Sequence, residues 1–434
     1  MTVRVACVAA ALAAVSAPAA SRLPTFTRPQ SFPTKKNPQS VAIGDLNGDG
    51  KPDLALVERY DGVVAVLLNR GDATFGKRRE FASGHPAFSL AIGDVSGDGR
   101  PDLVTANEDD TASVLVNDGR GSFRAGATYK TGVFPAAVAV GDLNGDGALD
   151  VVTANADAGT VSVLLNRGDG TFGPTSDYPA RFGTDSVAIG DLNGDGKPDL
   201  ATANETDSAS VLLNTGGGGF VHSIDYTAGR QPSAVAVGDV NGDRRPDLVT
   251  ANALGNSVSV FVARRDGGFL ERVDYGTGGQ DPAAVALGDL NGDGKPELVT
   301  ANYAPGTVTV FVNDGAGSFD RSRQHPAESA PDSVAIGDLN GDGHADLAVA
   351  NSDAAVVSVL DNATGLCRVP GVRGRTLPAA RRAIARARCR VGKIRRAYSV
   401  IVEKGRVIAE RPSPGRVLPA GGKVDLVVSR GRRP

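Results

Sequence analysis

Short apolar segments alternate with acidic, glycine-rich turns along most of the chain. Alternating residues in Ser40–Leu46 (SVAIGDL) predict a half-buried strand, which an acidic loop follows. Two more apolar segments come next in each unit, such as DLVTAN from Asp102 and TVSVLLN from Thr160. A hairpin such as NRGDGTF then leads to a fourth strand near a recurring Phe. Each unit is therefore predicted to hold four strands, with the acidic loop joining the first to the second.

This unit occurs seven times. The segment GDLNGDGKPDL at Gly44–Leu54 returns, with small changes, from six later glycines. The leading Asp residues of successive loops are 49, 48, 49, 48, 50 and 49 residues apart. A near-constant period of this length is typical of one four-stranded blade of a β-propeller. The later copies begin at Gly93, Gly141, Gly190, Gly238, Gly288 and Gly337.

The recurring Phe residues reveal an offset between the two ends of the array. Phe26 precedes the first acidic loop, and no such Phe follows the last unit at Ser333–Leu360. Thr25–Val41 also aligns without a gap to Thr171–Val187. The N-terminal strand should therefore complete the last blade, which leaves no open sheet edge. We predict an all-β, seven-bladed β-propeller of four-stranded blades over residues 25–362; an open solenoid, the alternative, does not explain the offset.

Charge divides the chain into two parts. Of the 434 residues, 46 are Lys or Arg and 49 are Asp or Glu. Leu366–Pro434 contains 19 of the basic and 3 of the acidic residues, so the remainder contains 27 basic and 46 acidic residues. The two balances, +16 and −19, predict a separate C-terminal domain with a different role.

The first 20 residues are typical of a secretory signal peptide. Arg4 supplies a positive charge, Val5–Val15 is a short apolar run, and Ala17–Ala20 offers a small-residue cleavage site. The run of about 11 residues is too short to span a bilayer, and Cys7 would be removed with it. We expect a secreted protein without a membrane span, and Cys367 and Cys389 as an even pair that forms a disulfide; two buried thiols are the alternative.

Oxygen-bearing side chains occupy positions one, three, five and nine of each acidic loop, counted from its leading Asp. Alternate residues converge when a chain wraps around an ion, and glycines at positions four and six permit the positive φ that wrapping needs. All-oxygen ligation favours Ca²⁺, with the backbone carbonyl at position seven as a further ligand. We therefore predict up to seven structural calcium sites, one in each loop. The predicted ligands are Asp45, Asn47, Asp49, Asp53, Asp94, Ser96, Asp98, Asp102, Asp142, Asn144, Asp146, Asp150, Asp191, Asn193, Asp195, Asp199, Asp239, Asn241, Asp243, Asp247, Asp289, Asn291, Asp293, Glu297, Asp338, Asn340, Asp342 and Asp346.

A single loop of this kind could also be an Asx-rich turn without metal. Three carboxylates in each loop, with no neighbour expected to neutralise them, favour a cation. The loops are not EF-hands, because Glu is missing at position twelve and flanking helices are missing. Ser96 is a poorer ligand, and Glu297 replaces Asp at position nine. Arg244 stands where Gly should supply the turn geometry, which makes the site at Asp239 the weakest prediction.

The seven GDxNGDG loops and the GDGTF-like hairpins resemble the FG-GAP and VCBS repeats of integrin α-chain propellers and bacterial surface proteins. This resemblance covers residues 25–362. It implies calcium on one face of the disc and an unknown protein or glycan ligand on the opposite face. Local packing is the alternative role for the aromatic residues that we expect in the loops of that opposite face. These residues are Tyr60, Phe88, Phe134, Phe182 and Tyr303.

The C-terminal residues 367–431 predict a small α+β domain. Thr376 can cap a helix that extends to about Arg388, and two strands are expected at Arg406–Glu410 and Val424–Ser429. The Val369-Pro370 pair, the Ala-rich helix and the closing VDLVVSRG resemble a PASTA domain. That resemblance implies contact with peptidoglycan. The alternative for the excess of Arg is a solvated face.

We predict a binding or adhesion protein at the cell surface or cell wall, not an enzyme, and expect a monomer. A polysaccharide lyase or hydrolase, or a glycan-binding lectin, is the alternative. No G-x-S-x-G or H-E-x-x-H motif is present, the four His residues show no motif spacing, and Trp, which favours sugar stacking, is absent. Nucleic acid is not expected as a partner, because an exported module with one aromatic residue lacks a base-stacking surface.

Overall fold

The computed structural model describes residues 23–221, 223–265, 267–364, 367–418 and 422–433. It divides the chain into two compact units, Met1–Asn362 and Ala363–Pro434. The predicted signal peptide at residues 1–20 lies outside the described residues. Within the described ranges, no helix has both the length and the apolar character needed to cross a membrane.

The described part of the first unit contains seven four-stranded sheets. Six of them run in chain order from the inner to the outer strand, and the seventh takes its outer strand from the N-terminal part of the chain. A two-stranded hairpin, β17 (Asn214–Gly216) and β18 (Gly219–Phe220), joins β16 to β19. The sheets are β2 (Pro38–Gly44), β3 (Asp53–Glu58), β4 (Val63–Leu67) and β5 (Arg79–Ala82); β6 (Ala87–Gly93), β7 (Asp102–Asn107), β8 (Thr111–Asn117) and β9 (Phe123–Lys130); β10 (Pro135–Gly141), β11 (Asp150–Asn155), β12 (Thr160–Leu164) and β13 (Ser176–Pro179); β14 (Thr184–Gly190), β15 (Asp199–Asn204), β16 (Ser208–Leu212) and β19 (Ile224–Thr227); β20 (Pro232–Gly238), β21 (Asp247–Asn252), β22 (Ser257–Phe261) and β23 (Val273–Gly276); β24 (Gln280–Gly288), β25 (Glu297–Ala304), β26 (Thr307–Val312) and β27 (Arg321–Pro326); and β28 (Pro331–Gly337), β29 (Asp346–Asn351), β30 (Val356–Leu360) and β1 (Gln30–Pro33).

The N-terminal strand completes the last of these sheets, as the sequence offset predicts. Strand β1 pairs antiparallel with β30, with Gln30 opposite Val359 and Pro33 opposite Val356. A further bridge joins Phe26 to Asn362. The outer edge of the seventh sheet is thus supplied by the start of the chain, which ties the two ends of the array together.

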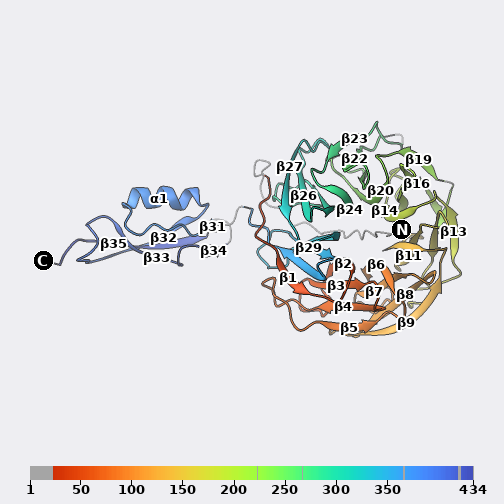
Figure 1. The fold of residues 1–434 in the computed structure, drawn as a ribbon, viewed down its shortest axis with the longest axis horizontal. Coiled ribbons are helices and arrows are strands. Elements are labelled where there is room, and N and C mark those ends of the chain that lie inside the picture. Colours follow the sequence, from red (N-terminus) through yellow and green to blue (C-terminus); the bar gives the residue numbers. More distant parts are fainter. Residues whose placement is uncertain (1–22, 222, 266, 365–366, 419–421, 434) are drawn as a thin grey trace. The chain divides into compact units, whose positions relative to one another are not determined.

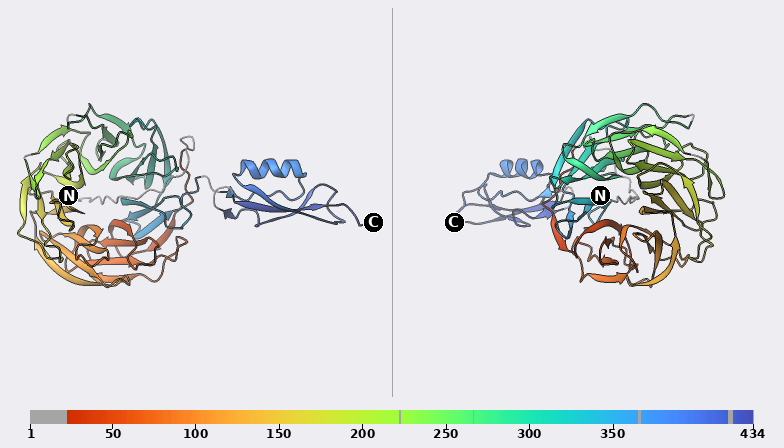
Figure 2. Two further views of the ribbon diagram at one scale, coloured as in Figure 1. Left: turned by 180° about the vertical axis from the view of Figure 1, so that it is seen from behind. Right: turned by 45° about the vertical axis from the view of Figure 1, so that its right-hand side comes forward.

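The sheets stand side by side in a ring (Figures 1 and 2). Each inner strand contacts the inner strands of both neighbouring sheets, and β28 contacts β2. The glycine that ends each inner strand lies against an aliphatic side chain of the next sheet. A Cβ at Gly190 would lie 2.6 Å from Val237 Cγ1, and one at Gly337 would lie 2.9 Å from Ile43 Cγ2. The first Gly of each GDxNGDG segment therefore permits close packing between sheets.

The recurring Phe residues form an outer set of contacts between sheets. Phe172 lies edge-on to Tyr129 of the preceding sheet, with ring centroids 5.1 Å apart. Phe123 begins the fourth strand of its sheet, and the other fourth strands begin two to four residues after the recurring Phe, as β5 does after Phe75. The equivalent pairs are Phe26–His325, Phe32–Phe75, Phe81–Phe123, Tyr129–Phe172, Tyr178–Phe220, Tyr226–Phe269 and Tyr275–Phe319.

The second unit packs one helix, α1 (Leu377–Arg386), over a three-stranded sheet (Figure 2). The helix is confirmed, and its buried Ala380 and Ile384 face the core. Thr376 takes the N-cap position but makes no side-chain cap hydrogen bond. The sheet order is β32 (Arg390–Ala397), β35 (Lys423–Ser429) and β33 (Val407–Arg411), and β31 (Cys367–Arg368) pairs with β34 (Val417–Leu418).

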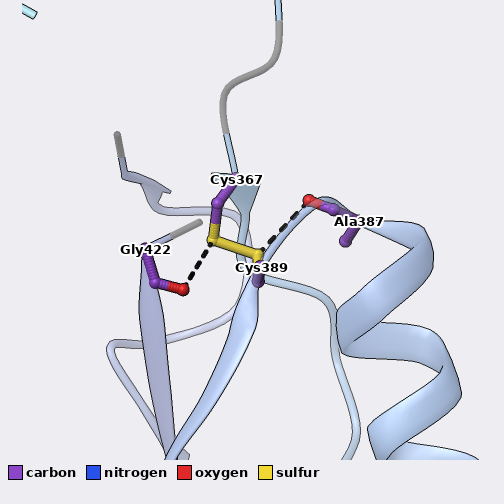
Figure 3. The surroundings of a disulfide bond; sticks show 4 residues. All are labelled: Cys367, Ala387, Cys389 and Gly422. Carbon is purple, nitrogen blue, oxygen red and sulfur yellow. Dashed lines mark hydrogen bonds between the residues drawn. A yellow bond between two sulfur atoms is a disulfide. The ribbon is translucent and has the colours of Figure 1, made fainter. Parts of the chain in front are cut away.

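Strand β32 is missing from the sequence prediction. Its sequence, RVGKIRRA, is rich in Arg, and an irregular register between Val391 and Ile394 interrupts the alternation of apolar residues. The predicted disulfide is confirmed: Cys367 and Cys389 are joined, and the bond links β31 to the segment between α1 and β32 (Figure 3).

Candidate functional site

The acidic loops join the first strand of each sheet to the second, and the leading Asp organises each loop. In the first loop, Asp45 Oδ1 accepts the N–H groups of Gly48 at 2.8 Å and Asp49 at 3.2 Å, and its Oδ2 accepts that of Gly50 at 2.8 Å. Asn47 Oδ1 accepts the Asp49 N–H at 2.8 Å. The loop therefore contains the Asx turns of the alternative interpretation, because the side chains at positions one and three accept backbone N–H groups within the loop.

The acid at position nine serves the sheet as well as the loop. Asp53 is fully buried; its Oδ2 accepts the Leu46 N–H at 3.0 Å and its Oδ1 the Asn69 N–H at 2.7 Å. It thus clamps the loop to the end of the third strand. Burial, together with the nearby Asp49 and Asp45, raises the pKa of Asp53 to about 6 against the lowering effect of its two N–H donors. The same clamp recurs at Asp150, Asp199, Asp247 and Asp346, and Asp102 forms it with the N–H groups of Ser96 and Asn117.

In six of the seven sheets, an Asn at the end of the third strand links the acidic loops of neighbouring sheets. This role was not predicted from the sequence. Asn69 Nδ2 donates to Pro52 O at 2.8 Å in its own sheet and to Leu339 O at 2.7 Å in the seventh sheet. In the fifth sheet Ala263 takes this place. The signal was present as an Asn 15 or 16 residues after position nine. It recurs as Asn69, Asn117, Asn166, Asn214, Asn313 and Asn362.

The expectation that nothing neutralises the loop carboxylates is wrong in four loops. Lys51 Nζ lies 3.2 Å from Asp49 Oδ2, so the basic residue at position seven pairs with the acid at position five. This pairing was missed because only the backbone carbonyl of position seven was considered. The corresponding pairs are Arg100–Asp98, Lys197–Asp195 and Arg245–Asp243.

The fifth loop keeps the common shape in spite of its substitution. Arg244 adopts a φ of 67°, the left-handed conformation that Gly has at this position in the other loops. Its N–H donates to Asp239 Oδ2 at 2.7 Å, as Gly50 does in the first loop. The loop is therefore formed, at a cost of about 1 kcal/mol in backbone strain.

The sixth loop differs because Glu297 is longer than Asp. Its Oε2 accepts the Leu290 N–H at 2.8 Å, and its Oε1 accepts Asn291 Nδ2 at 2.6 Å. Burial, together with the nearby Asp293 and Asp289, raises the pKa of Glu297 to about 8. The buried Asn291 Oδ1 has no hydrogen-bond partner.

The donor set of these loops fits a hard cation. Carboxylate and amide oxygens are the only side-chain ligands at the four positions, apart from the Ser96 hydroxyl, and the orphaned Asn291 oxygen is the kind of acceptor that a cation satisfies. Within the described residues, no three Asp, Glu, His or Cys side chains are gathered closely enough to hold a metal ion. Coordination by the 28 predicted ligands therefore stays a prediction.

The opposite ends of the strands carry the aromatic residues expected on a recognition face, with one correction. Tyr60 and Phe182 are 60% and 61% exposed. Phe88 is fully buried in β6, where it packs against Phe134 at 4.6 Å, so it cannot contact a ligand. The local-packing alternative is right for Phe88, because the first strand begins earlier than its sequence pattern suggested. Tyr303 belongs to β25 and is half-buried.

Six overlapping matches to the family model for the FG-GAP-like repeat extend over residues 45–105, 94–153, 142–202, 191–250, 239–300 and 289–349. The chain belongs to the FG-GAP-like repeat family. A second family model, the PASTA domain, matches residues 368–430. A search among curated proteins gives no match.

Solved structures similar to this FG-GAP-like protein are β-propellers. BBS1N, crystallised in complex with ARL6DN, has a TM-score of 0.57 at 13% identity and covers 78% of this chain and 97% of its own. The WD40 domain of Neurospora crassa Pan2 has a TM-score of 0.53 at 11% identity, covering 80% and 97%. The WD40 propeller of Doa1 has a TM-score of 0.51 at 14% identity, covering 78% and 97%. At these identities the likeness shows the β-propeller fold alone.

The PASTA domain has a basic groove of about 680 Å³ that is lined by residues of all three strands of its sheet, β32, β35 and β33, and by Pro412. Lys393, Arg411 and Lys423 line it together with one acid, Asp425. Asp425 Oδ1 accepts the Lys393 backbone N–H at 2.6 Å, so this hydrogen bond partly compensates the negative charge of Asp425. The groove is therefore suited to an anionic group such as a carboxylate.

Proposed function

We propose that this FG-GAP-like protein is an exported, calcium-stabilised binding protein of the cell wall or cell surface, and not an enzyme. Its PASTA domain contacts peptidoglycan, and the propeller face opposite the acidic loops binds a protein or glycan. The observation that carries the proposal is the sevenfold acidic loop whose acids at positions one and nine bind backbone amides. Acids used in this way support the fold, which favours a scaffold for binding.

In this proposal, calcium would be held by the side chains at positions one, three and five, with further oxygens from positions seven and nine. The ion would supply positive charge beside the three acids of each loop, which would offset their mutual repulsion. The protein's own residues keep the loop in shape through the amide contacts of Asp45 and Asp53. Extracellular calcium modules bind with dissociation constants of about 0.1–1 mM.

The test compares thermal unfolding in 1 mM Ca²⁺ and in chelator, together with calcium stoichiometry. A site with a dissociation constant of about 0.1 mM contributes about 1.4 kcal/mol under these conditions, so five to seven sites give a large rise in Tm. Asp146→Asn should remove one bound ion and part of the rise. Asp169→Asn is the matched control, since both side chains accept an N–H two residues later, Asp146 from Ala148 at 2.8 Å and Asp169 from Thr171 at 2.9 Å. Equal effects of the two variants, or no calcium response, would contradict the calcium proposal.

The peptidoglycan proposal rests on the basic groove, because the peptides of peptidoglycan carry carboxylates. Lys393→Gln with Lys423→Gln should lower the fraction of protein that sediments with insoluble peptidoglycan severalfold. Arg381→Gln with Arg382→Gln on the exposed face of α1 is the control with the same loss of charge. An equal loss in both double variants would indicate general charge attraction and refute a role for the groove.

The ligand of the propeller is tested by substitutions on the face opposite the acidic loops. Tyr60→Ser and Phe182→Ser remove the two most exposed aromatic rings of the propeller without touching its core. Both variants should keep the calcium response and lose adhesion to cells or glycan arrays. Adhesion that is unchanged in both variants would place the ligand elsewhere.

A further inference from the structure

The PASTA domain exposes an apolar loop at one end. Val400 and Ile401 are 74% and 87% exposed, the two highest values among the large hydrophobic side chains of the described residues that are exposed. Tyr398, beside them, is 48% exposed. We name Tyr398, Val400 and Ile401 the apolar tip. Among the residues of the domain whose exposure the structure describes, the exposed large hydrophobic side chains all belong to this tip, and such concentration marks a contact surface.

The tip is held in place by the domain. Ser399 Oγ accepts the N–H groups of Ile401 at 3.3 Å and Val402 at 3.0 Å. Ser429 Oγ donates to Val402 O at 2.7 Å, and the Ser399 N–H donates to Gly431 O at 2.9 Å. The loop is therefore tied to the end of β35, and its apolar side chains project outward because its polar groups are satisfied inward.

Basic residues accompany the tip. The Arg430 guanidinium lies 5.8 Å from the centre of the Tyr398 ring, and Lys404 follows the loop. Arg432 and Arg433 are exposed and come directly after the segment that holds Ser399. Glu403, the acid in the loop, is paired with Arg406 at 2.8 Å. An apolar apex accompanied by basic residues is complementary to anionic lipid, whose headgroups attract Lys and Arg while the acyl boundary accepts aliphatic side chains.

The tip lies at the end of the sheet that is opposite the disulfide. The described part of the domain begins at Cys367, which is bound to Cys389 immediately before β32 (Figure 3). Strand β32 then runs for eight residues, or roughly 26 Å, before the chain reaches the tip. The disulfide and the tip are therefore at opposite ends of the sheet.

We propose that the apolar tip docks this domain on an anionic lipid surface, with Val400 and Ile401 entering the acyl boundary and Lys404, Arg430, Arg432 and Arg433 contacting headgroups. Lipid fits better than a second copy of the chain, because two tips would bring like charges together. This inference is independent of the peptidoglycan proposal, whose groove is formed by Lys393, Arg411 and Lys423.

The first test uses fluorescence, because the chain contains no Trp. Ile401→Trp is introduced into the chain that lacks residues 1–20. Its emission should shift to the blue with phosphatidylglycerol vesicles and stay unchanged with phosphatidylcholine vesicles. Val273→Trp on β23 is the control, since Val273 is an exposed aliphatic residue of the propeller, and its emission should not respond.

The second test measures co-sedimentation with the same vesicles. Val400→Ser with Ile401→Ser should weaken binding at least tenfold, and each of Lys404→Gln and Arg430→Gln about fivefold. Circular dichroism and an intact disulfide verify that the variants are folded. No binding to phosphatidylglycerol, equal binding to both lipids, or binding that the serine variants leave unchanged overturns the proposal. A dimer that the serine variants abolish also overturns it, because a second copy would then cover the tip.

Discussion

Replacing Gly190 by Ala tests whether the glycine at the end of each inner strand is needed for packing between sheets. The added Cβ would lie 2.6 Å from Val237 Cγ1, whereas carbon atoms in ordinary contact are about 3.5–4.0 Å apart. The overlap of about 1 Å cannot be relieved by rotation, because Val is stiff at χ1. Strands β14 and β20 must therefore separate. Overpacking of this kind costs about 1–3 kcal/mol, and we expect about 2 kcal/mol.

The effect is measured by thermal and urea unfolding in excess calcium, and a loss of about 2 kcal/mol should lower Tm by about 4 °C. Gly44→Ala should cost less, because its nearest contact is the flexible end of Ile92, Cδ1 at 3.2 Å. Gly276→Ala on β23 is the control, since no atom lies within 4 Å of its added Cβ. Equal stability of Gly190→Ala and Gly276→Ala, within about 0.5 kcal/mol, would show that the glycine is not needed for packing between sheets.

Three further substitutions test single positions where one sheet departs from the others. Ala263→Asn should supply the missing link between loops and raise the free energy of unfolding by about 1 kcal/mol, measured in urea; a loss would show that the site has no room for Asn. Arg244→Gly should remove the left-handed strain and raise stability by up to about 1 kcal/mol, and calorimetry should show tighter calcium binding; unchanged stability would contradict the strain. Burial and the nearby Arg323 lower the pKa of His325 to about 4, so its neutral form stabilises the fold above pH 6.5 and this contribution is lost between pH 6.5 and 4, by at most about 3 kcal/mol. His325→Tyr, which matches the aromatic residue of the other sheets, should gain most over the parent protein near pH 4; a gain that does not vary with pH would refute the role of His325.

Much of the fold could be predicted because its signals are local. The period of 48 to 50 residues, the strand alternation and the missing Phe after the last unit led to the ring and to the placement of β1 beside β30. The helix α1 followed from a capping residue and a one-sided apolar face. Strand β32 could not be predicted in this way, since its charged sequence carries no alternation and it is held by pairing with β35.

The candidate site was predicted only as a list of oxygen atoms. Spacing identified Asp45, Asn47 and Asp49, whose contacts lie within the loop. Spacing could not show that both carboxylate oxygens of Asp53 accept hydrogen bonds, one from the Leu46 N–H and one from the Asn69 N–H. Asn69 lies at the end of a different strand, so its contact with Asp53 is not visible in the loop sequence.

By itself, the sequence determined what depends on neighbours along the chain: the repeat, the four-stranded unit, the turn chemistry of the acidic loops and the two-domain division of charge. Only the tertiary structure decided what depends on neighbours between sheets. It placed Gly190 against Val237, linked Asn69 to Leu339, and buried Phe88, which had been expected on the recognition face. The physical reason is that these partners lie tens to hundreds of residues apart, and closure of the ring brings them into contact.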